Sequence, residues 1–323
     1  MAAGAPGRLP RRARIRAGAA RHGRCPDAAV TGRDATPTNW GRWGADDERG
    51  TLNHITDTVR AAAVAEARTG RTVSLARPIH PVPLAGGPYT AGTAAVPAAV
   101  SQAMTFTGTP PRALTDLLVI NTHVAGLTHL DALGHIPADG QVYPGRPIAD
   151  VATAAGLTHA STTAFAEGIL TRGVLCDLAP GGSLPSGHPV TGADLDAAAR
   201  HTGVDVEPGD ALVVRGGWDV PARVGAAALP GMTVDAVRWM HLRQVSLYLG
   251  DIGDAHPPLD PTYPLPLHQI GLARLGLPLV DATAVDGLAA VGAELQRYRF
   301  LLLIAPLPLH GATGVAVNPI AVF

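Results

Sequence analysis

The sequence predicts an α/β fold, because strand and helix signals alternate along its second half. Apolar runs at residues 172–178 and 210–218 are typical of buried strands. Segments 191–200 and 233–243 each begin with a threonine suited to the N-cap of a helix. The chain has 323 residues, 46% of them hydrophobic. That length suffices for one large domain or two small ones.

Composition excludes several classes of partner. The formal net charge of −1 gives the chain no excess of positive charge with which to attract nucleic acid or an anionic membrane surface. No apolar run approaches the roughly 20 residues of a membrane-spanning helix. Two cysteines, Cys25 and Cys176, do not make a disulfide framework. We therefore expect a cytoplasmic protein with a small-molecule substrate, and we expect Cys176 to pack in the core.

The N-terminal residues differ in composition from the rest. Residues 1–36 mix arginine with alanine and glycine, and no apolar segment follows the Arg11-Arg12 pair, so an export signal is not expected. We predict a disordered tail over 1–36 and a single domain over 37–323.

Four further segments are predicted before the centre of the chain. A helix capped by Thr56 should run over 56–68, and a strand should follow at 72–79. Residues 80–113 are rich in Pro, Gly, Ala and Thr without periodicity, so we expect a long loop that shapes the substrate entrance. A short apolar strand is expected at 116–121.

The segment that this strand enters carries most of the candidate chemistry. Seven consecutive residues of an otherwise apolar run include His129, Asp131 and His135. Burying these polar side chains would be costly without a partner such as a metal. In an extended chain His129 and Asp131 point the same way, about 7 Å apart, and can converge on one ion. His135 comes within reach if the chain turns at Gly134. The alternative is three unrelated polar groups with local hydrogen bonds.

Residues 128–135 resemble the signature of the cyclase family, metal-dependent hydrolases that include bacterial kynurenine formamidase and isatin hydrolase. The signature reads His-x-Gly-Thr-His-x-Asp-x-x-x-His. Residues 40–53 resemble the family's Trp-Gly-x-Asp-Asp-Glu-x-Gly-Thr-Leu-Asn segment, and 311–322 resemble its last strands. The resemblance covers about residues 40–323. It implies a kynurenine formamidase/cyclase-like (swivelling β/β/α) single domain, with a mixed, partly barrel-like sheet and outer helices.

A second candidate half-site lies near the C-terminus. His268 begins a short helix that should end at Gly276, and residues 278–281 should return as a strand. Eight helical residues climb about 12 Å and four extended residues descend about 13 Å, which returns Asp281 near His268. The resemblance implies that both bind metal, with Asp281 in place of the usual Glu. On the residues alone, His268 would instead be a histidine at a helix start.

The chain departs from the family pattern at the site. Ala125 stands where family members have a histidine, and Val315 and Ala316 replace a Ser-Pro pair. His123 could supply the missing imidazole. An extended chain would hold it about 20 Å from the next ligand, so this requires a marked bend after it.

The resemblance implies specific roles for these residues. The metal, Zn or Mn, would be held by His129, Asp131, His135, His268 and Asp281. His135 and Asp131 would be catalytic, and Trp40, Trp43 and His123 would contact substrate. The expected activity is arylformamidase-like hydrolysis of a C–N bond (amide, N-formyl or lactam) or an ester in a small, largely neutral substrate. A homodimer or homotetramer is expected.

Two other functions stay open. The departure at Ala125 is compatible with a weak or absent metal and a biosynthetic cyclase or dehydratase of secondary metabolism, with His135 and Asp131 as acid and base. A non-catalytic binding protein is the third possibility. Asp251 and Asp254 are expected to cap turns rather than to join the site.

Overall fold

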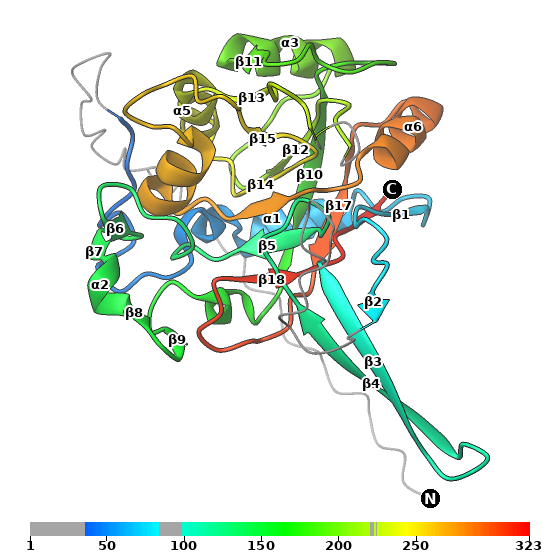
Figure 1. The fold of residues 1–323 in the computed structure, drawn as a ribbon. Coiled ribbons are helices and arrows are strands. Elements are labelled where there is room, and N and C mark those ends of the chain that lie inside the picture. The colour runs from blue at the N-terminus through cyan, green and yellow to red at the C-terminus, as the bar shows by residue number, and fades with distance from the viewer. Residues whose placement is uncertain (1–35, 84–98, 220–222, 224) are drawn as a thin grey trace, which may run out of the picture. The chain divides into compact units, whose positions relative to one another are not determined.

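The structure, a computed structural model, describes residues 36–83, 99–219, 223 and 225–323. Thr36–Phe323 form one compact unit, built around a mixed sheet that curls as a partial barrel (Figure 1). In the described part of the chain this sheet has nine strands, in the spatial order β1 (Thr72–Ser74), β19 (Ile320–Val322), β17 (Arg299–Ile304), β10 (Ile169–Asp177), β12 (Ala211–Arg215), β14 (Leu247–Gly250), β16 (Leu279–Asp281), β5 (His129–Asp131) and β18 (Gly314–Ala316).

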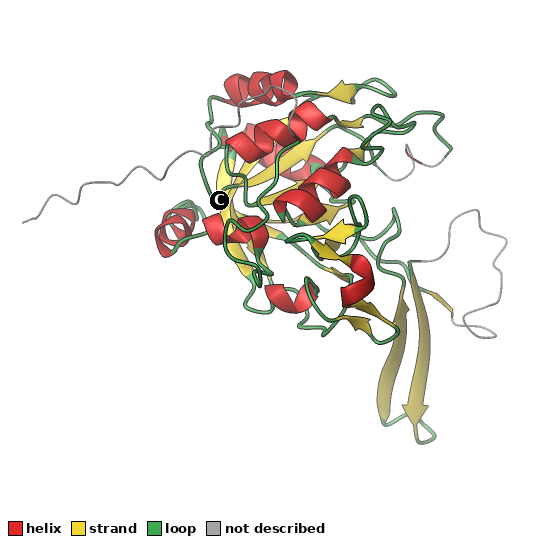
Figure 2. Cartoon of the chain, turned by 90° about the vertical axis from the view of Figure 1, so that its left-hand side faces the viewer, coloured by secondary structure: helices red, strands yellow, loops and turns green. Residues whose placement is uncertain are grey.

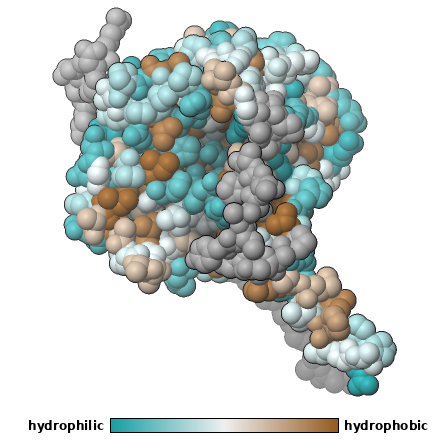
Figure 3. Space-filling view, viewed as in Figure 1, coloured by the Kyte–Doolittle hydropathy of each residue, from teal (hydrophilic) through white to brown (hydrophobic). Residues whose placement is uncertain are grey.

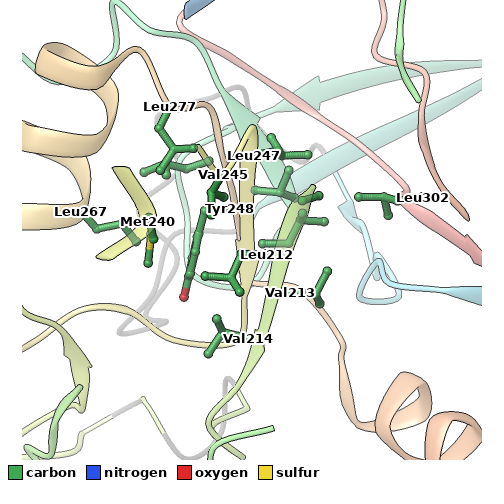
Figure 4. Close-up of a cluster of buried hydrophobic side chains, with 14 of the residues drawn as sticks. Leu212, Val213, Val214, Met240, Val245, Leu247, Tyr248, Leu267, Leu277 and Leu302 are labelled. Carbon is green, nitrogen blue, oxygen red and sulfur yellow. The ribbon is translucent and has the colours of Figure 1, made fainter. Parts of the chain in front are cut away.

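The centre of the sheet is parallel and its margins are antiparallel. Strands β10, β12, β14 and β16 pair in parallel, whereas β5 pairs antiparallel with both β16 and β18. Parallel strands are typically covered on both faces, which explains their continuous apolar sequence. Figure 4 shows the resulting core around Leu212, Tyr248 and Leu267, all fully buried.

Helices pack beside this sheet (Figure 2). The longer ones are α1 (Asp57–Val64), α3 (Gly192–Thr202), α5 (Val234–Leu242), the π-helix η3 (Leu267–Leu275) and α6 (Asp286–Leu295). The threonine caps are present: Thr56, Thr191 and Thr233 each accept a hydrogen bond from a backbone N–H three residues on. None of the helices in the described ranges is long and apolar enough to cross a membrane.

Short elements complete the domain. They are η1 (Gly50–His54), α2 (Ile148–Val151), η2 (Thr162–Phe165), the sheet of β11 (Pro189–Val190), β13 (Gly231–Met232) and β15 (Gly253–Asp254), and the pairs β6 (Gln141–Val142) with β7 (Arg146–Pro147) and β8 (Ala152–Thr153) with β9 (Gly156–Leu157).

The long loop predicted over 80–113 is wrong for its second half. Residues 84–98 lie outside the described residues, but β3 (Val100–Thr107) pairs in antiparallel register with β4 (Ala113–Ile120), and β2 (Val82–Pro83) joins them. Polar residues in β3 resembled loop composition, yet side chains alternate between two faces, as a strand requires. This hairpin extends away from the body of the domain (Figures 1 and 2).

Two other boundaries were predicted too long. Helix α1 ends at Val64 rather than near residue 68, and β1 ends at Ser74 rather than near 79. Cys176 lies in β10 and is fully buried, as expected, and burial raises the pKa of its thiol to about 12. The predicted tail over 1–36 lies almost wholly outside the described residues.

Candidate metal centre

Strand β5 presents His129 and Asp131 on one face of the sheet. Both side chains are buried, and His129 Nε2 lies 3.4 Å from Asp131 Oδ1. His129 Nδ1 lies 2.8 Å from the carbonyl oxygen of Leu127. Because a carbonyl only accepts, Nδ1 donates this hydrogen bond, and Nε2 is the nitrogen that faces Asp131. The two side chains thus converge as the spacing predicted.

His123 reaches the same point because the chain bends after it. Turn hydrogen bonds join Val124 N–H to Thr122 and Leu127 N–H to Val124, so residues 123–127 are not an extended strand. His123 Nδ1 lies 3.0 Å from Asp131 Oδ1. The bend that a ligand role for His123 required is therefore present.

Thr313 and Gly314, at the start of β18, both contact the ring of His123. Its Nε2 lies 3.0 Å from the hydroxyl of Thr313. A Cβ at Gly314 would lie only 2.5 Å from His123 Cε1, so a larger residue there would displace the ring. Ala125 is exposed. A histidine at position 125 would therefore leave this bend toward solvent, while position 123 faces Asp131.

The second half-site is brought in by η3 and β16. Asp281 is the register partner of His129, because β16 pairs with β5. His268 Nε2 lies 3.4 Å from Asp281 Oδ2 and 3.6 Å from Asp131 Oδ2. The chain thus returns to one point through the helix that begins at Leu267 and the strand that ends at Asp281. The lengths of these two elements predicted this return.

Asp254, which we expected to cap a turn, orients His268. Its Oδ2 lies 2.6 Å from His268 Nδ1, and its oxygens also accept the backbone N–H groups of Leu267 and His268. Asp254 ends strand β15 and precedes His268 by fourteen residues, so only the fold reveals the contact. Asp251 does cap a loop, since it accepts the backbone N–H groups of residues 216–218.

Asp131 is the shared centre of the cluster. His123, His129 and Asp131 form one group of donor atoms, and Asp131, His268 and Asp281 form a second, each within 4.8 Å. We call these ligand sets 1 and 2. Among the described residues, both carboxylate oxygens of Asp131 are buried without a hydrogen-bond partner, as is Nδ1 of His123. Such orphaned atoms fit a bound cation, because buried polar groups otherwise find partners.

The pKa shifts follow from this packing. Burial alone would raise the pKa of Asp131, but the surrounding imidazoles of His123, His268 and His129 hold it well below its usual range. Burial alone would lower the pKa of His268, but Asp131, Asp254 and Asp281 together raise it well above its usual value. A positive charge is therefore favoured at this point, whether a proton or a metal supplies it.

His135 adjoins the ligand sets without belonging to either of them in the described part of the chain. Its ring stacks on His123 with centroids 3.7 Å apart and planes 5° apart. Burial lowers the pKa of His135 to about 4. The imidazole is thus neutral near pH 7 and can accept a proton.

Trp40 and Trp43 are not brought to this cluster by the fold. Trp40 Nε1 donates to the carbonyl of Ala273 at 2.7 Å, and Trp43 packs edge-on against His54. The acidic residues between them and η1 are structural as well: Asp47 accepts from the Tyr143 hydroxyl, and Glu48 accepts from the Ala160 N–H. Within one chain, Trp40 and Trp43 therefore pack against the core rather than beside the cluster.

Val315, which stands in place of the family's serine, lies away from the cluster. Val315 is the register partner of Leu130 and packs in the hydrophobic core, on the face opposite His129 and Asp131. Ala316 pairs with His129 itself. The departure at Val315 therefore lies away from the ligand sets.

A partly barrel-like α/β domain with a buried His/carboxylate cluster defines the class of this protein. The family model Cyclase, described as "Putative cyclase", matches residues 71–255. A crystal structure described as a novel cyclase superposes with a TM-score of 0.76 at 31% sequence identity, covering 89% of this chain and 98% of that one. The chain belongs to the cyclase family.

More distant structures share the fold. Isatin hydrolase A from Labrenzia aggregata, bound to benzyl benzoate, has a TM-score of 0.55 at 18% identity and covers 84% of this chain and 98% of that one. Isatin hydrolase A from Ralstonia solanacearum has a TM-score of 0.55 at 19% identity and covers 82% and 97%. No curated protein sequence matches the chain.

Proposed function

We propose that the protein is a metal-dependent hydrolase of a C–N bond (amide, N-formyl or lactam) or an ester in a small, largely neutral substrate, with arylformamidase-like activity. The observation that carries this proposal is the meeting of two ligand sets at Asp131, whose two buried oxygens have no hydrogen-bond partner among the described residues. Family membership and the isatin hydrolases of the same fold support a hydrolytic function.

Ligand set 1 would hold one divalent ion and ligand set 2 a second, with Asp131 common to both. Mixed imidazole and carboxylate donors suit Zn²⁺ or Mn²⁺. A divalent ion bound there would lower the pKa of a coordinated water to about 7 and would polarise a carbonyl oxygen.

The residues around the ligand sets supply orientation and proton transfer. Asp254 holds the ring of His268, and Leu127 holds that of His129, so their Nε2 atoms stay directed at the centre. His135, neutral near pH 7, accepts a proton at an imidazole nitrogen and returns it to the leaving nitrogen or oxygen.

Metal analysis tests the proposal most directly. Purified protein should contain Zn or Mn, and chelation should abolish turnover on a panel of N-formyl, lactam and ester substrates. Restoring the metal should restore turnover. Full activity in metal-free protein would overturn the proposal.

A biosynthetic cyclase or dehydratase is the second candidate, supported by His135, an unprotonated base stacked on His123 beside Asp131. Turnover that survives chelation but is lost in His135→Gln would favour it over hydrolysis.

We also propose that the protein is a homo-oligomer assembled through the β3–β4 hairpin. One face of this hairpin carries Met104, Phe106, Leu114, Leu118 and Ile120, between 45% and 62% exposed, and Figure 3 shows hydrophobic side chains on its surface. An isolated hairpin with a bare apolar face is unstable and prone to association. A second copy covers such a face symmetrically. Replacing Phe106 and Leu118 by Ser should shift the mass in sedimentation toward the monomer.

A further inference from the structure

A cavity of about 240 Å³ adjoins ligand set 2. Asp254, His268 and Asp281 line its polar side, and Trp218, Ile252, Leu229 and Leu265 contribute apolar wall. Since a water occupies about 30 Å³ of liquid, the space holds roughly eight waters. A molecule with a single ring fills it, and the reacting bond of such a molecule would lie beside His268.

The apolar wall is rigid at Trp218. Its indole Nε1 donates to the carbonyl of Leu184 at 2.9 Å, and its backbone N–H donates to Asp251 at 2.9 Å. An indole fixed in this way offers a preformed flat surface to an aromatic or other apolar group.

One cation interrupts this wall. Arg223 lines the cavity and is half-buried. Within the described residues, its guanidinium makes no ion pair within 4.0 Å and no hydrogen bond, whereas Asp254 and Asp281 are both engaged by His268. Asp251 is close enough to feel the charge of Arg223, but its oxygens already accept three backbone N–H groups. Burying an unpaired guanidinium in a partly apolar cavity costs free energy unless an anion pairs with it.

We propose that Arg223 binds a carboxylate of the substrate, so that the molecule taken by this cavity is an aromatic or apolar amide or ester bearing one anionic group. The planar donor fork of arginine matches a carboxylate in two parallel hydrogen bonds. This inference rests on the proposed hydrolysis and refines its largely neutral substrate: the body of the molecule is apolar, and its charge is confined to the end at Arg223.

A matched substrate pair tests the proposal with the metal-loaded full chain. We would compare 2-formamidobenzoate with formanilide, which presents the same N-formyl bond on a ring without a carboxylate. In Arg223→Gln, kcat/KM for 2-formamidobenzoate should fall about 10- to 100-fold, mainly through KM, while formanilide changes little. Arg223→Lys should recover part of the loss. Arg200→Gln is the control, because Arg200 is exposed on α3.

A binding measurement separates this proposal from the hydrolytic function. Benzoate binding, followed by calorimetry, should weaken about 10-fold or more in Arg223→Gln and stay unchanged in Arg200→Gln. If neither formamide is hydrolysed by wild-type protein while benzoate binding depends on Arg223, the carboxylate site stands and arylformamidase-like hydrolysis fails. If Arg223→Gln binds benzoate as wild-type protein does, or loses both formamides equally, the carboxylate site is overturned.

Discussion

The two ligand sets that meet at Asp131 are built in different ways. Set 1 is local in sequence: His129 and Asp131 share the strand β5, and His123 lies a few residues before them. Set 2 joins β5 to His268 on η3 and Asp281 on β16. Alternation along β5 accounts for His129 and Asp131 in the first set, whereas the second set meets Asp131 only because β16 pairs with β5.

Their electrostatics differ as well. The outer nitrogens of set 1 contact neutral groups, the carbonyl of Leu127 and the hydroxyl of Thr313. In set 2, His268 alone contacts three carboxylates, those of Asp131, Asp254 and Asp281. The denser negative charge of set 2 should bind a divalent cation more tightly, which makes the two sets experimentally separable.

Removing the shared carboxylate should have the largest effect. Asp131→Asn takes a charge from both sets, so we expect loss of both ions and a fall in turnover well beyond the roughly 100-fold typical of an outer-shell substitution. Elemental analysis and steady-state kinetics measure these outcomes. Thermal unfolding in chelator is the control, because it shows whether the variant is folded when no metal is bound. A variant that kept its full metal content would contradict a bridging Asp131.

Single substitutions should then separate the sets. We expect His268→Gln and His129→Gln each to retain one ion of the two, and the ion left in His129→Gln to bind more tightly because set 2 carries more negative charge. Competition with a chromogenic chelator measures both affinities. Equal affinities would show that the charge difference between the sets is neutralised.

The position of the displaced imidazole can be tested next. His123→Ala should weaken metal binding at set 1 by at least about 10-fold. Adding Ala125→His to that variant should not restore it, because position 125 is exposed. Recovery of the metal in the double variant would mean that the bend after residue 123 rearranges.

Loss of the orienting carboxylate should be milder. Asp254→Asn keeps a hydrogen-bonding group beside His268 but removes the charge, so metal affinity at set 2 should fall about 10- to 100-fold. Set 1 should be unaffected, and metal titration of the variant would show a single weakened step. Weakening of both steps would indicate that Asp254 acts on the whole cluster.

A substitution outside both sets should have the smallest effect. Trp40→Phe removes the hydrogen bond to Ala273, which should cost about 1 kcal/mol of unfolding free energy. Metal content per chain and turnover per chain should equal those of the wild-type protein. A selective loss of turnover would instead support the expected role of Trp40 and Trp43 at substrate, which would then have to come from a neighbouring subunit.

Features set by adjacent residues could be predicted from the sequence, whereas features set by packing could not. The helix caps at Thr56, Thr191 and Thr233 were predicted because a cap depends on a residue and its immediate successors. The β3 strand was missed because half of its side chains are polar and it finds its partner only in β4. Asp254 was misassigned because capping residues and orienting carboxylates look alike in sequence.

The sequence by itself determined that His129 and Asp131 point the same way, since alternation along a strand requires it. It also determined that a helix from 267 and a strand to 281 bring their ends together, since rise per residue sets both lengths. Only the tertiary structure decided that His123 rather than a residue at 125 faces Asp131, because a bend and the space left by Gly314 depend on neighbouring strands. It likewise decided that Val315 faces the core, because the pairing register assigns each side chain to a face.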